Sequence, residues 1–219
     1  MHDTTHRLVI FDLDGTLVDS LGDLADSMNA VLTKLGHPTH AGAAYRHFVG
    51  DGIVMLARRA LPAAARRDEL IAECVAEMRA EYATRQTATT RPFPGVPEVL
   101  SELRRRGVLT AVLSNKPDRP SREIVDALLA FHPFDMVRGA RPDVPLKPDP
   151  TAALDIAERL GVEASEAVFV GDTNIDMRTG CAAGMTAVGV TWGFRDEHDL
   201  VSGGAHRVIH RPAELLPIV

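Results

Sequence analysis

The stretch Leu8-Val9-Ile10-Phe11-Asp12-Leu13-Asp14-Gly15 places four apolar residues directly before a short acidic segment. A continuous apolar run of this length is typical of a strand that is buried on both faces of a parallel sheet, and the segment after it is typical of a turn. Side chains alternate along extended backbone, so both carboxylates can project the same way while Leu13 points into the core. The stretch therefore predicts a buried strand that ends in Asp12 and Asp14.

Short β-favouring runs recur along the chain at residues 109–113, 167–170, 186–190 and, more weakly, 208–209. Segments with helical spacing alternate with them at residues 97–106, 121–130, 151–160 and 174–183, and glycines supply helix ends at Gly107, Gly161 and Gly184. Alternating strands and helices imply an α/β fold with a doubly wound parallel sheet, that is, a Rossmann-like core.

The alternation breaks after the first strand. Apolar residues from Leu21 to Leu35 fall on one helical face that Gly36 ends, and residues 54–61 and 69–82 also have helical spacing. These segments lack a convincing strand pattern. We therefore expect a core formed by residues 1–18 and 91–219, with a small α-helical domain, residues 19–90, inserted into it.

Composition limits the classes of function. Hydrophobic residues make up 45% and charged residues 25% of the 219-residue chain, as in ordinary globular proteins. The net charge of −6 argues against nucleic acid or a membrane surface as a partner, although local cations or a metal could still hold a small anionic substrate. The apolar run at residues 8–11 is too short for a signal peptide or a membrane span, so we expect a cytoplasmic protein.

Four aspartates follow two of the predicted strands. Asp12 and Asp14 come after the first strand, and Asp172 and Asp176 come after the strand at residues 167–170. The carboxyl ends of parallel strands meet at the edge where such sheets bind ligands. Converging carboxylates require a cation, and oxygen ligands favour Mg²⁺ where a phosphate completes its coordination. Taken singly, each pair is also compatible with a turn or with a helix cap formed by Asp172.

Only three of the 24 lysine and arginine residues are lysines: Lys34, Lys116 and Lys147. Lys116 and Lys147 fall in segments that we expect to be loops near the same edge of the sheet. A compact ammonium group cannot be replaced by a guanidinium group at a tight phosphate site. We interpret Lys147 as the functional lysine, while Lys116 could have a direct role or be an exposed loop residue.

Four segments follow one another along the chain: Asp12-Leu13-Asp14-Gly15-Thr16, Ser114-Asn115-Lys116-Pro117, Lys147-Pro148, and Gly171-Asp172 with Asp176. In this order they resemble the four motifs of the haloacid dehalogenase-like hydrolases. The helical insert resembles the small cap domain of the phosphoglycolate phosphatase-like branch of that superfamily. The resemblance spans nearly the whole chain and implies a Mg²⁺-dependent phosphatase, a phosphoric monoester hydrolase that acts on a small phosphorylated metabolite. Its leading candidate substrate is 2-phosphoglycolate.

The resemblance also implies how the reaction proceeds. Asp12 would attack phosphorus and form an aspartyl-phosphate, while Asp14 would protonate the leaving oxygen and later activate water. Lys147 would offset the charge of the nucleophile and of the phosphate. A carboxylate is already ionised at neutral pH, and a second carboxylate can serve first as acid and then as base.

The metal ligands, and Ser114 and Asn115 as phosphate ligands, follow from the same resemblance. Mg²⁺ would be held by the Asp12 carboxylate, the Asp14 backbone carbonyl, Asp172 and, directly or through water, Asp176. The candidate substrate-binding residues are Ser114, Asn115, Thr16 and Gly50. The segment Gly50-Asp51-Gly52 permits close backbone approach to a ligand, or it forms a simple turn before a helix that starts near Ile53.

Two other functions share parts of this pattern. A sugar-phosphate mutase of the same superfamily has all four motifs and would need the insert to slow hydrolysis. A signalling module also accepts phosphate on an aspartate in a doubly wound sheet, but it needs no helical insert, and an acid/base such as Asp14 would shorten its signal. Repeated turnover separates a phosphatase from a module that keeps its phosphate.

Overall fold

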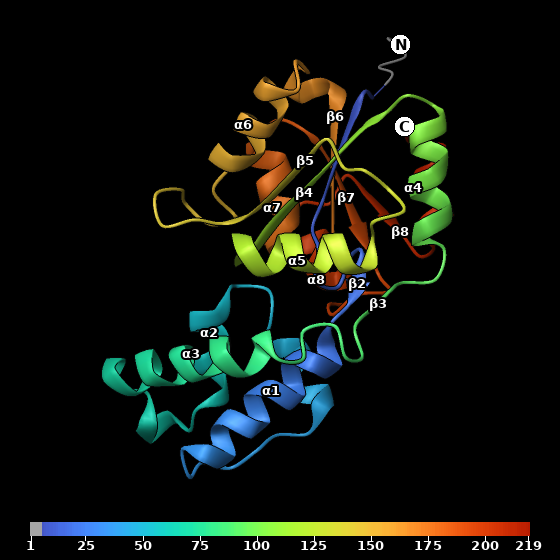
Figure 1. Ribbon diagram of the computed structural model, residues 1–219. Helices are drawn as coiled ribbons and strands as arrows, with labels where there is room; N and C mark the ends of the chain where they lie inside the picture. The colour runs from blue at the N-terminus through green and yellow to red at the C-terminus, as the bar shows by residue number, and fades with distance from the viewer. Residues whose placement is uncertain (1–5) are drawn as a thin grey trace.

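A parallel sheet of six strands organises the protein, whose structure is a computed structural model that describes residues 6–219 (Figure 1). The strand order is β5-β4-β1-β6-β7-β8, which places β1 inside the sheet. The six strands are β1 (Leu8–Phe11), β4 (Leu109–Pro117), β5 (Met136–Ala140), β6 (Ala167–Gly171), β7 (Thr186–Val190) and β8 (Arg207–Ile209). The predicted α/β fold with a doubly wound parallel sheet is confirmed.

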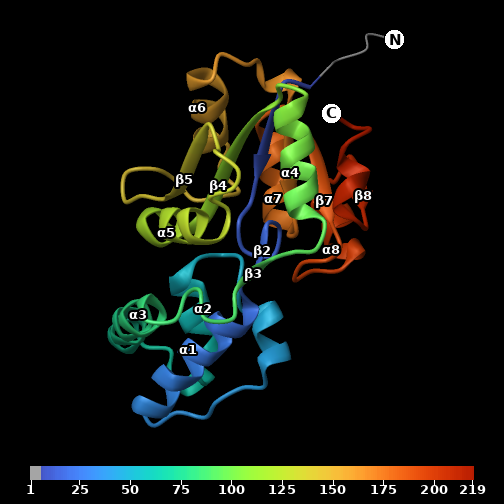
Figure 2. The ribbon, with the colours of Figure 1, turned by 45° about the vertical axis from the view of Figure 1, so that its right-hand side comes forward.

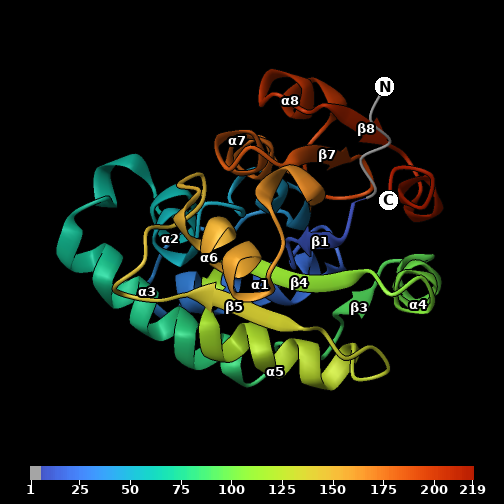
Figure 3. The same ribbon diagram turned by 90° about the horizontal axis from the view of Figure 1, so that it is seen from above.

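Helices cover both faces of this sheet (Figure 3). Val9 and Phe11 of β1 pack with α4 and α5 on one face, and Leu8 and Ile10 pack with α6 on the other. This alternation is why the strand reads as a continuous apolar run. The helices of the core are α4 (Val96–Arg105), α5 (Asp118–Leu128), α6 (Thr151–Arg159), α7 (Asn174–Ala182) and α8 (Glu197–Ser202).

One strand of the six-stranded sheet and one α-helix of the core have no counterpart among the predicted elements. Strand β5 contains Arg138 and Gly139 and is mostly half-buried, because it lies at the edge of the sheet. It therefore lacks the apolar run that marks a strand buried on both faces. Helix α8 has six residues, of which only Leu200 is buried. It therefore has too few apolar positions to give a periodic signal in the sequence.

Three helices form the insert between β2 (Val18–Asp19) and β3 (Arg91–Pro92). They are α1 (Leu21–Lys34), α2 (Ile53–Ala60) and α3 (Asp68–Ala83). Their apolar residues form a hydrophobic cluster that includes Met28 and Met78, Tyr45 from the segment between α1 and α2, and Phe194 from the core. Strands β2 and β3 pair antiparallel, so the chain enters and leaves the insert through one two-stranded ribbon (Figure 2). The division at residues 19–90 stays a prediction. Among residues 6–219, each helix is too short or too polar to span a bilayer.

Asp23 of α1 ties the start of the insert to its end. Its carboxylate is buried and accepts hydrogen bonds from the backbone N–H and hydroxyl groups of Thr89 and Thr90, at 2.6 to 2.9 Å. Burial opposes the ionised form of Asp23, but these hydrogen bonds outweigh it and lower the pKa of the carboxyl below its usual 3.8. The ionised carboxylate thus fixes the linker that returns to the core.

We predict that Asp23→Asn destabilises the protein, because an amide replaces two of these acceptor sites with donors that face other donors. The expected loss is about 1–3 kcal/mol, measured as a lower Tm at pH 7. A depressed pKa also means that this stabilisation is present above pH 3.8 and is lost as pH falls through the lowered pKa. The control is Asp26→Asn, the same change at an exposed position of α1. Equal Tm values for the two variants would contradict this role.

Candidate active site

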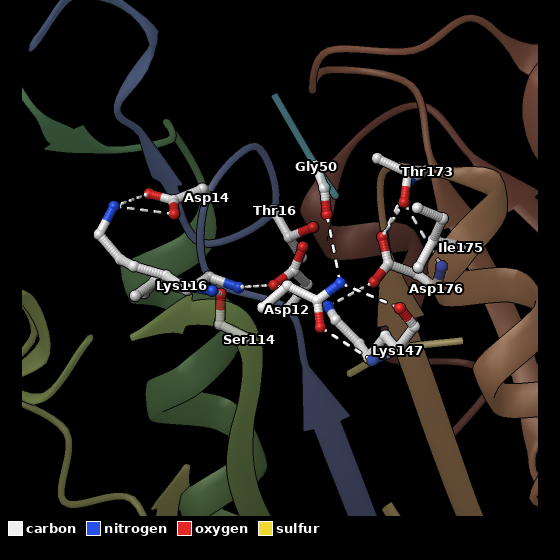
Figure 4. Close-up of polar contacts among 12 residues, drawn as sticks. Asp12, Asp14, Thr16, Gly50, Ser114, Lys116, Lys147, Thr173, Ile175 and Asp176 are labelled. Atoms are coloured by element: carbon white, nitrogen blue, oxygen red, sulfur yellow. Dashed lines mark hydrogen bonds and ion pairs between the residues drawn. The ribbon is translucent and has the colours of Figure 1, made fainter. Parts of the chain in front are cut away.

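The carboxyl ends of three neighbouring strands bring the predicted motifs together. Phe11 at the end of β1 is in register with Val112 of β4 and Val170 of β6, so the residues after these positions share one edge of the sheet. Asp12 follows β1, Ser114 lies two residues further along β4, and Asp172 follows β6. Lys147, in the loop between β5 and α6, reaches the same edge (Figure 4).

An acidic cluster forms at this edge. Carboxylate oxygens of Asp12, Asp172 and Asp176 all lie within 4.8 Å of one another, and all three side chains are buried. Lys147 Nζ lies 2.9 Å from Asp12 Oδ1 and donates to Asp176 Oδ1 at 2.6 Å. The backbone N–H of Leu13 also donates to Asp12 Oδ1, at 2.7 Å. These contacts fix the orientation of the Asp12 carboxylate.

Burial dominates the electrostatics of the cluster. It raises the pKa of Asp12 to about 7, against the attraction of Lys147 and together with repulsion from Asp176. Burial and the charges of Asp176 and Asp12 likewise raise the pKa of Asp172 well above its usual value. For Lys147, burial favours the neutral amine, but Asp12 and Asp176 outweigh it and raise the pKa. Charge within the cluster is therefore unbalanced towards the negative.

The cluster fits a divalent cation. Three converging carboxylates meet a single ammonium group, so a cation of charge +2 would balance the site. All the converging donors are carboxylate oxygens, which suit hard ions such as Mg²⁺. The Asp14 carboxylate lies outside this set. The assignment of Asp14 to the metal through its backbone carbonyl stays a prediction.

Close backbone approach fixes the carboxylates in place. A Cβ atom on Gly15, whose φ is +86°, or on Gly193 would lie 2.3 Å from atoms of Asp172, and one on Gly171 would lie 2.2 Å from Asp176 Cβ. Gly15 is thus required both by its backbone conformation and by the side chain beside it. This explains why the acidic segment after β1 ends in glycine.

Thr16, from the predicted set, and two residues outside that set hold Asp172 in place. Thr16 Oγ1 donates to Asp172 Oδ1 at 3.2 Å, and the backbone N–H of Phe194 donates to Oδ2 at 2.8 Å. Trp192 Nε1 donates to the backbone oxygen of Thr16 at 3.0 Å. Thr16 therefore contacts a candidate metal ligand, while its expected contact with substrate stays a prediction. The loop after β7 that carries Trp192 and Phe194 has no motif of its own in the sequence.

The cap of α7 differs from the simple alternative in which Asp172 caps the helix. Thr173 is the N-cap residue, its hydroxyl accepts from the backbone N–H of Asp176, and the Asp176 carboxylate accepts from the backbone N–H of Thr173 at 3.0 Å. Asp176 Oδ2 is thereby occupied, which leaves Oδ1 facing Lys147. The pattern of a threonine followed three residues later by an acid could have revealed this capping box.

Asn115 shapes the loop that carries Lys147. Its Oδ1 accepts from the Lys147 backbone N–H at 2.8 Å, and its Nδ2 donates to the Lys147 backbone oxygen at 3.1 Å. Nδ2 also lies 3.4 Å from the backbone oxygen of Gly50, in the insert. Asn115 thus contacts both the lysine loop and the insert, and Ser114 beside it is buried at the edge of the sheet.

The expectation that Lys116 lies in a loop, and the alternative that it is an exposed loop residue, are wrong. This residue lies in β4, which extends to Pro117, and it is buried, so it is not an exposed loop residue. Lys116 Nζ donates to Asp14 Oδ1 and Oδ2 at 3.0 and 2.9 Å and to the hydroxyl of Tyr82 at 2.9 Å. Burial would lower the pKa of Lys116, but Asp14 outweighs it and raises the pKa. Ser20 also donates to Asp14 Oδ1, at 2.6 Å.

A cavity of about 440 Å³ lies between this edge of the sheet and the insert. Asp12, Asp14, Ser114 and Lys116 line its core side. Its insert side is mainly apolar and includes Leu24, Val49, Gly50, Ile53, Leu56, Met78 and Tyr82. The cavity therefore extends from Asp12 of the acidic cluster to the insert. Gly50 lines it, and its contact with substrate stays a prediction.

Comparisons with known proteins agree with this geometry. The family model described as haloacid dehalogenase-like hydrolase matches residues 6–184. A phosphoglycolate phosphatase of Pseudomonas putida is 36% identical over 217 residues, which cover 98% of this chain and 80% of the relative. Another phosphoglycolate phosphatase, from Aquifex aeolicus, is 34% identical over 188 residues, which cover 86% of this chain and 86% of the relative.

A crystal structure from Lactobacillus delbrueckii subsp. bulgaricus, provisionally named as a phosphoglycolate phosphatase, superposes with a TM-score of 0.91 at 27% identity. It covers 96% of this chain, and 97% of its own chain is matched. The resemblance drawn from the four motifs is thus confirmed over nearly the whole sequence. On its sequence, its fold and its acidic edge, the chain belongs to the haloacid dehalogenase-like hydrolases.

Proposed function

We propose that this protein is a Mg²⁺-dependent phosphatase that hydrolyses a small phosphorylated metabolite through an aspartyl-phosphate on Asp12. The observation that carries this proposal is the Asp12 carboxylate itself, which lines the cavity and is oriented by Leu13 N–H and Lys147. A carboxylate held in this way can act as a nucleophile. The names of the relatives make 2-phosphoglycolate the leading candidate substrate.

In the first step, an oxygen of Asp12 forms a bond to phosphorus while the bond from phosphorus to the ester oxygen breaks. Asp14, when protonated, gives its proton to that leaving oxygen, and the alcohol departs. Ser114 faces the cavity with a hydroxyl that can donate to the phosphoryl oxygens. Lys147 sits beside the nucleophile and offsets negative charge as the two anions approach.

In the second step, Asp14, now ionised, takes a proton from water. The water attacks phosphorus, inorganic phosphate leaves, and the Asp12 carboxylate is restored. Both roles require Asp14 to turn towards the reacting oxygen, away from the Lys116 and Ser20 contacts described above. Acid and base duties on one residue follow from this exchange of protonation states.

The metal would be held by Asp12, Asp172 and Asp176, with the Asp14 backbone carbonyl as a further ligand. When bound, Mg²⁺ supplies positive charge that offsets the charge of phosphate and carboxylates. Thr16 and Phe194 orient the Asp172 carboxylate, and Thr173 orients Asp176. These contacts preorganise the ligands before substrate arrives.

We also propose that residues 19–90 act as a cap domain that opens and closes over the cavity. Two hydrogen bonds join the segment between α1 and α2 to the loop after β7. Arg46 donates to the backbone oxygen of Gly193, and Arg195 Nη2 donates to the backbone oxygen of Val49 at 2.9 Å. Phe194 of the core also packs in the hydrophobic cluster of the insert. The named hydrogen bonds are polar contacts of the kind found at interfaces between domains that move relative to one another. A closed cap would keep water away during phosphoryl transfer and then admit it.

We expect Asp12→Asn to lower kcat by about 1,000-fold or more, because the amide is nearly isosteric but is not a nucleophile. Turnover would be measured as phosphate released from 2-phosphoglycolate and from p-nitrophenyl phosphate. Rapidly quenched wild-type reactions should carry acid-stable phosphate on Asp12, and the variant should carry none. The control is Asp126→Asn, the same change at an exposed position of α5. Turnover by Asp12→Asn at the control's rate would exclude the covalent route, and stoichiometric phosphate retention without turnover would favour a signalling module.

Chelation should abolish activity, because the three buried carboxylates and a phosphate repel one another without a cation. After EDTA treatment and desalting, added Mg²⁺ should restore turnover, while Ca²⁺ should restore far less because its larger shell and longer bonds suit a different site geometry. Metal content would be measured by elemental analysis alongside the rate. Full turnover by protein shown to be metal-free would rule out metal dependence.

Gly50→Val should change kcat/KM by different factors for different phosphate esters. Gly50 has φ +110° and lines the cavity, and a Cβ there would lie 3.4 Å from Thr173 and 3.8 Å from Arg195. The control is Gly36→Val, which shares the unfavourable positive φ, at +72°, but has open space around it at the end of α1. One common factor for every ester would show that Gly50 does not contribute to specificity.

A further inference from the structure

Lys116 occupies an unusual position for a residue outside the proposed chemistry. It lines the cavity, it is buried, and its ammonium group lies between a catalytic carboxylate and the insert. The described residues that line the cavity include two other cations, Arg79 and Arg119, and both are exposed. Arg119 is moreover paired with Glu123 at 2.7 Å. Lys116 is thus the buried positive charge of this cavity.

The position of Lys116 along β4 relates it to the phosphate site. Ser114 and Lys116 lie two residues apart near the end of β4, where the pairing with β5 is irregular, and both line the cavity. Asn115 between them turns to the Lys147 loop. A ligand whose phosphate contacts Ser114 therefore presents the atoms just beyond its ester oxygen to the Lys116 ammonium group.

The charge partner of Lys116 changes during the proposed reaction. Lys116 is paired with Asp14, which must turn towards the ester oxygen and carry a proton when it acts as an acid. The neutral Tyr82 hydroxyl, at 2.9 Å, is then the remaining partner among the contacts of the ammonium group. A buried ammonium group without an anion is costly, so an anion on the substrate would be favoured at this place.

We propose that Lys116 determines specificity by binding a carboxylate on the alcohol portion of the substrate, one carbon from the ester oxygen, and that Tyr82 of α3 holds it there. This inference rests on the proposed phosphatase function. Asp14 and the substrate carboxylate then exchange places beside Lys116, so an anion on the substrate favours the turn of Asp14 towards the ester oxygen. The apolar walls formed by Leu24, Leu56 and Met78 strengthen the ion pair by excluding water.

The contact through Tyr82 links this recognition to the insert. Tyr82 is buried on α3, its hydroxyl accepts from Lys116, and its ring centroid lies 4.5 Å from Lys116 Nζ. Burial raises the pKa of Tyr82 to about 12, against the attraction of Lys116, so the hydroxyl is neutral. The insert therefore supplies a dipole that steers the lysine without neutralising it.

The test compares two esters that differ in one group, 2-phosphoglycolate and its neutral amide, phosphoglycolamide, with p-nitrophenyl phosphate as a general substrate. The readout is the ratio of kcat/KM for the acid to that for the amide, measured on the full chain with Mg²⁺. We expect this ratio to be about 10–100 in the wild type, because a hydrogen bond between charged groups is worth that factor. Any general loss from disturbing Asp14 cancels in the ratio.

Lys116→Met should bring the ratio to about 1, and Tyr82→Phe, which keeps both charges, should lower it severalfold. Lys34→Met makes the same chemical change at an exposed site of α1 and should keep the wild-type ratio. A wild-type ratio near 1, or a Lys116→Met variant that keeps the wild-type ratio, would overturn the inference while leaving the phosphatase function intact. If Lys116→Met does not fold, the wild-type and Tyr82→Phe ratios decide. If the protein hydrolyses none of the three esters, the phosphatase function is overturned and this inference with it.

Discussion

Buried negative charge is the constraint on which this edge of the sheet depends. The sheet brings Asp12, Asp172 and Asp176 together because β1 and β6 are neighbours that end in register, and the surrounding packing excludes water from their carboxylates. Lys147 offsets part of that charge through two short contacts. The remainder is what makes the site receptive to a divalent cation, and it explains why so many neighbouring groups serve only to hold carboxylates in place.

The core of the fold could be predicted because its signals are local. Strand β1 reads as four apolar residues, since helices cover both of its faces, and Gly107, Gly161 and Gly184 all have positive φ where helices end. Strand β5 could not be predicted in this way. Its place in the sheet comes from pairing with β4 at the edge, where half-buried residues such as Arg138 are tolerated.

The site residues that could be predicted are likewise those with a local signal in the sequence. Asp12, Asp14, Asp172 and Asp176 were identifiable because each follows a strand within a few residues, and the order of those strands places them at one edge. The contacts of Phe194 with Asp172 and of Tyr82 with Lys116 join residues 22 and 34 positions apart in the sequence. Such pairs depend on how loops and the insert pack against the core, which periodicity does not record.

The ribbon formed by β2 and β3 has a consequence for how this protein could diversify. Both ends of the insert lie side by side at Val18 and Pro92, and Asp23 fastens the outgoing segment to Thr89 and Thr90. A segment whose ends already meet can be exchanged for another at little cost in chain entropy, and the core need not rearrange to receive it. The ribbon is therefore a position at which a different insert could replace residues 19–90 while the core that carries the acidic cluster stays unchanged.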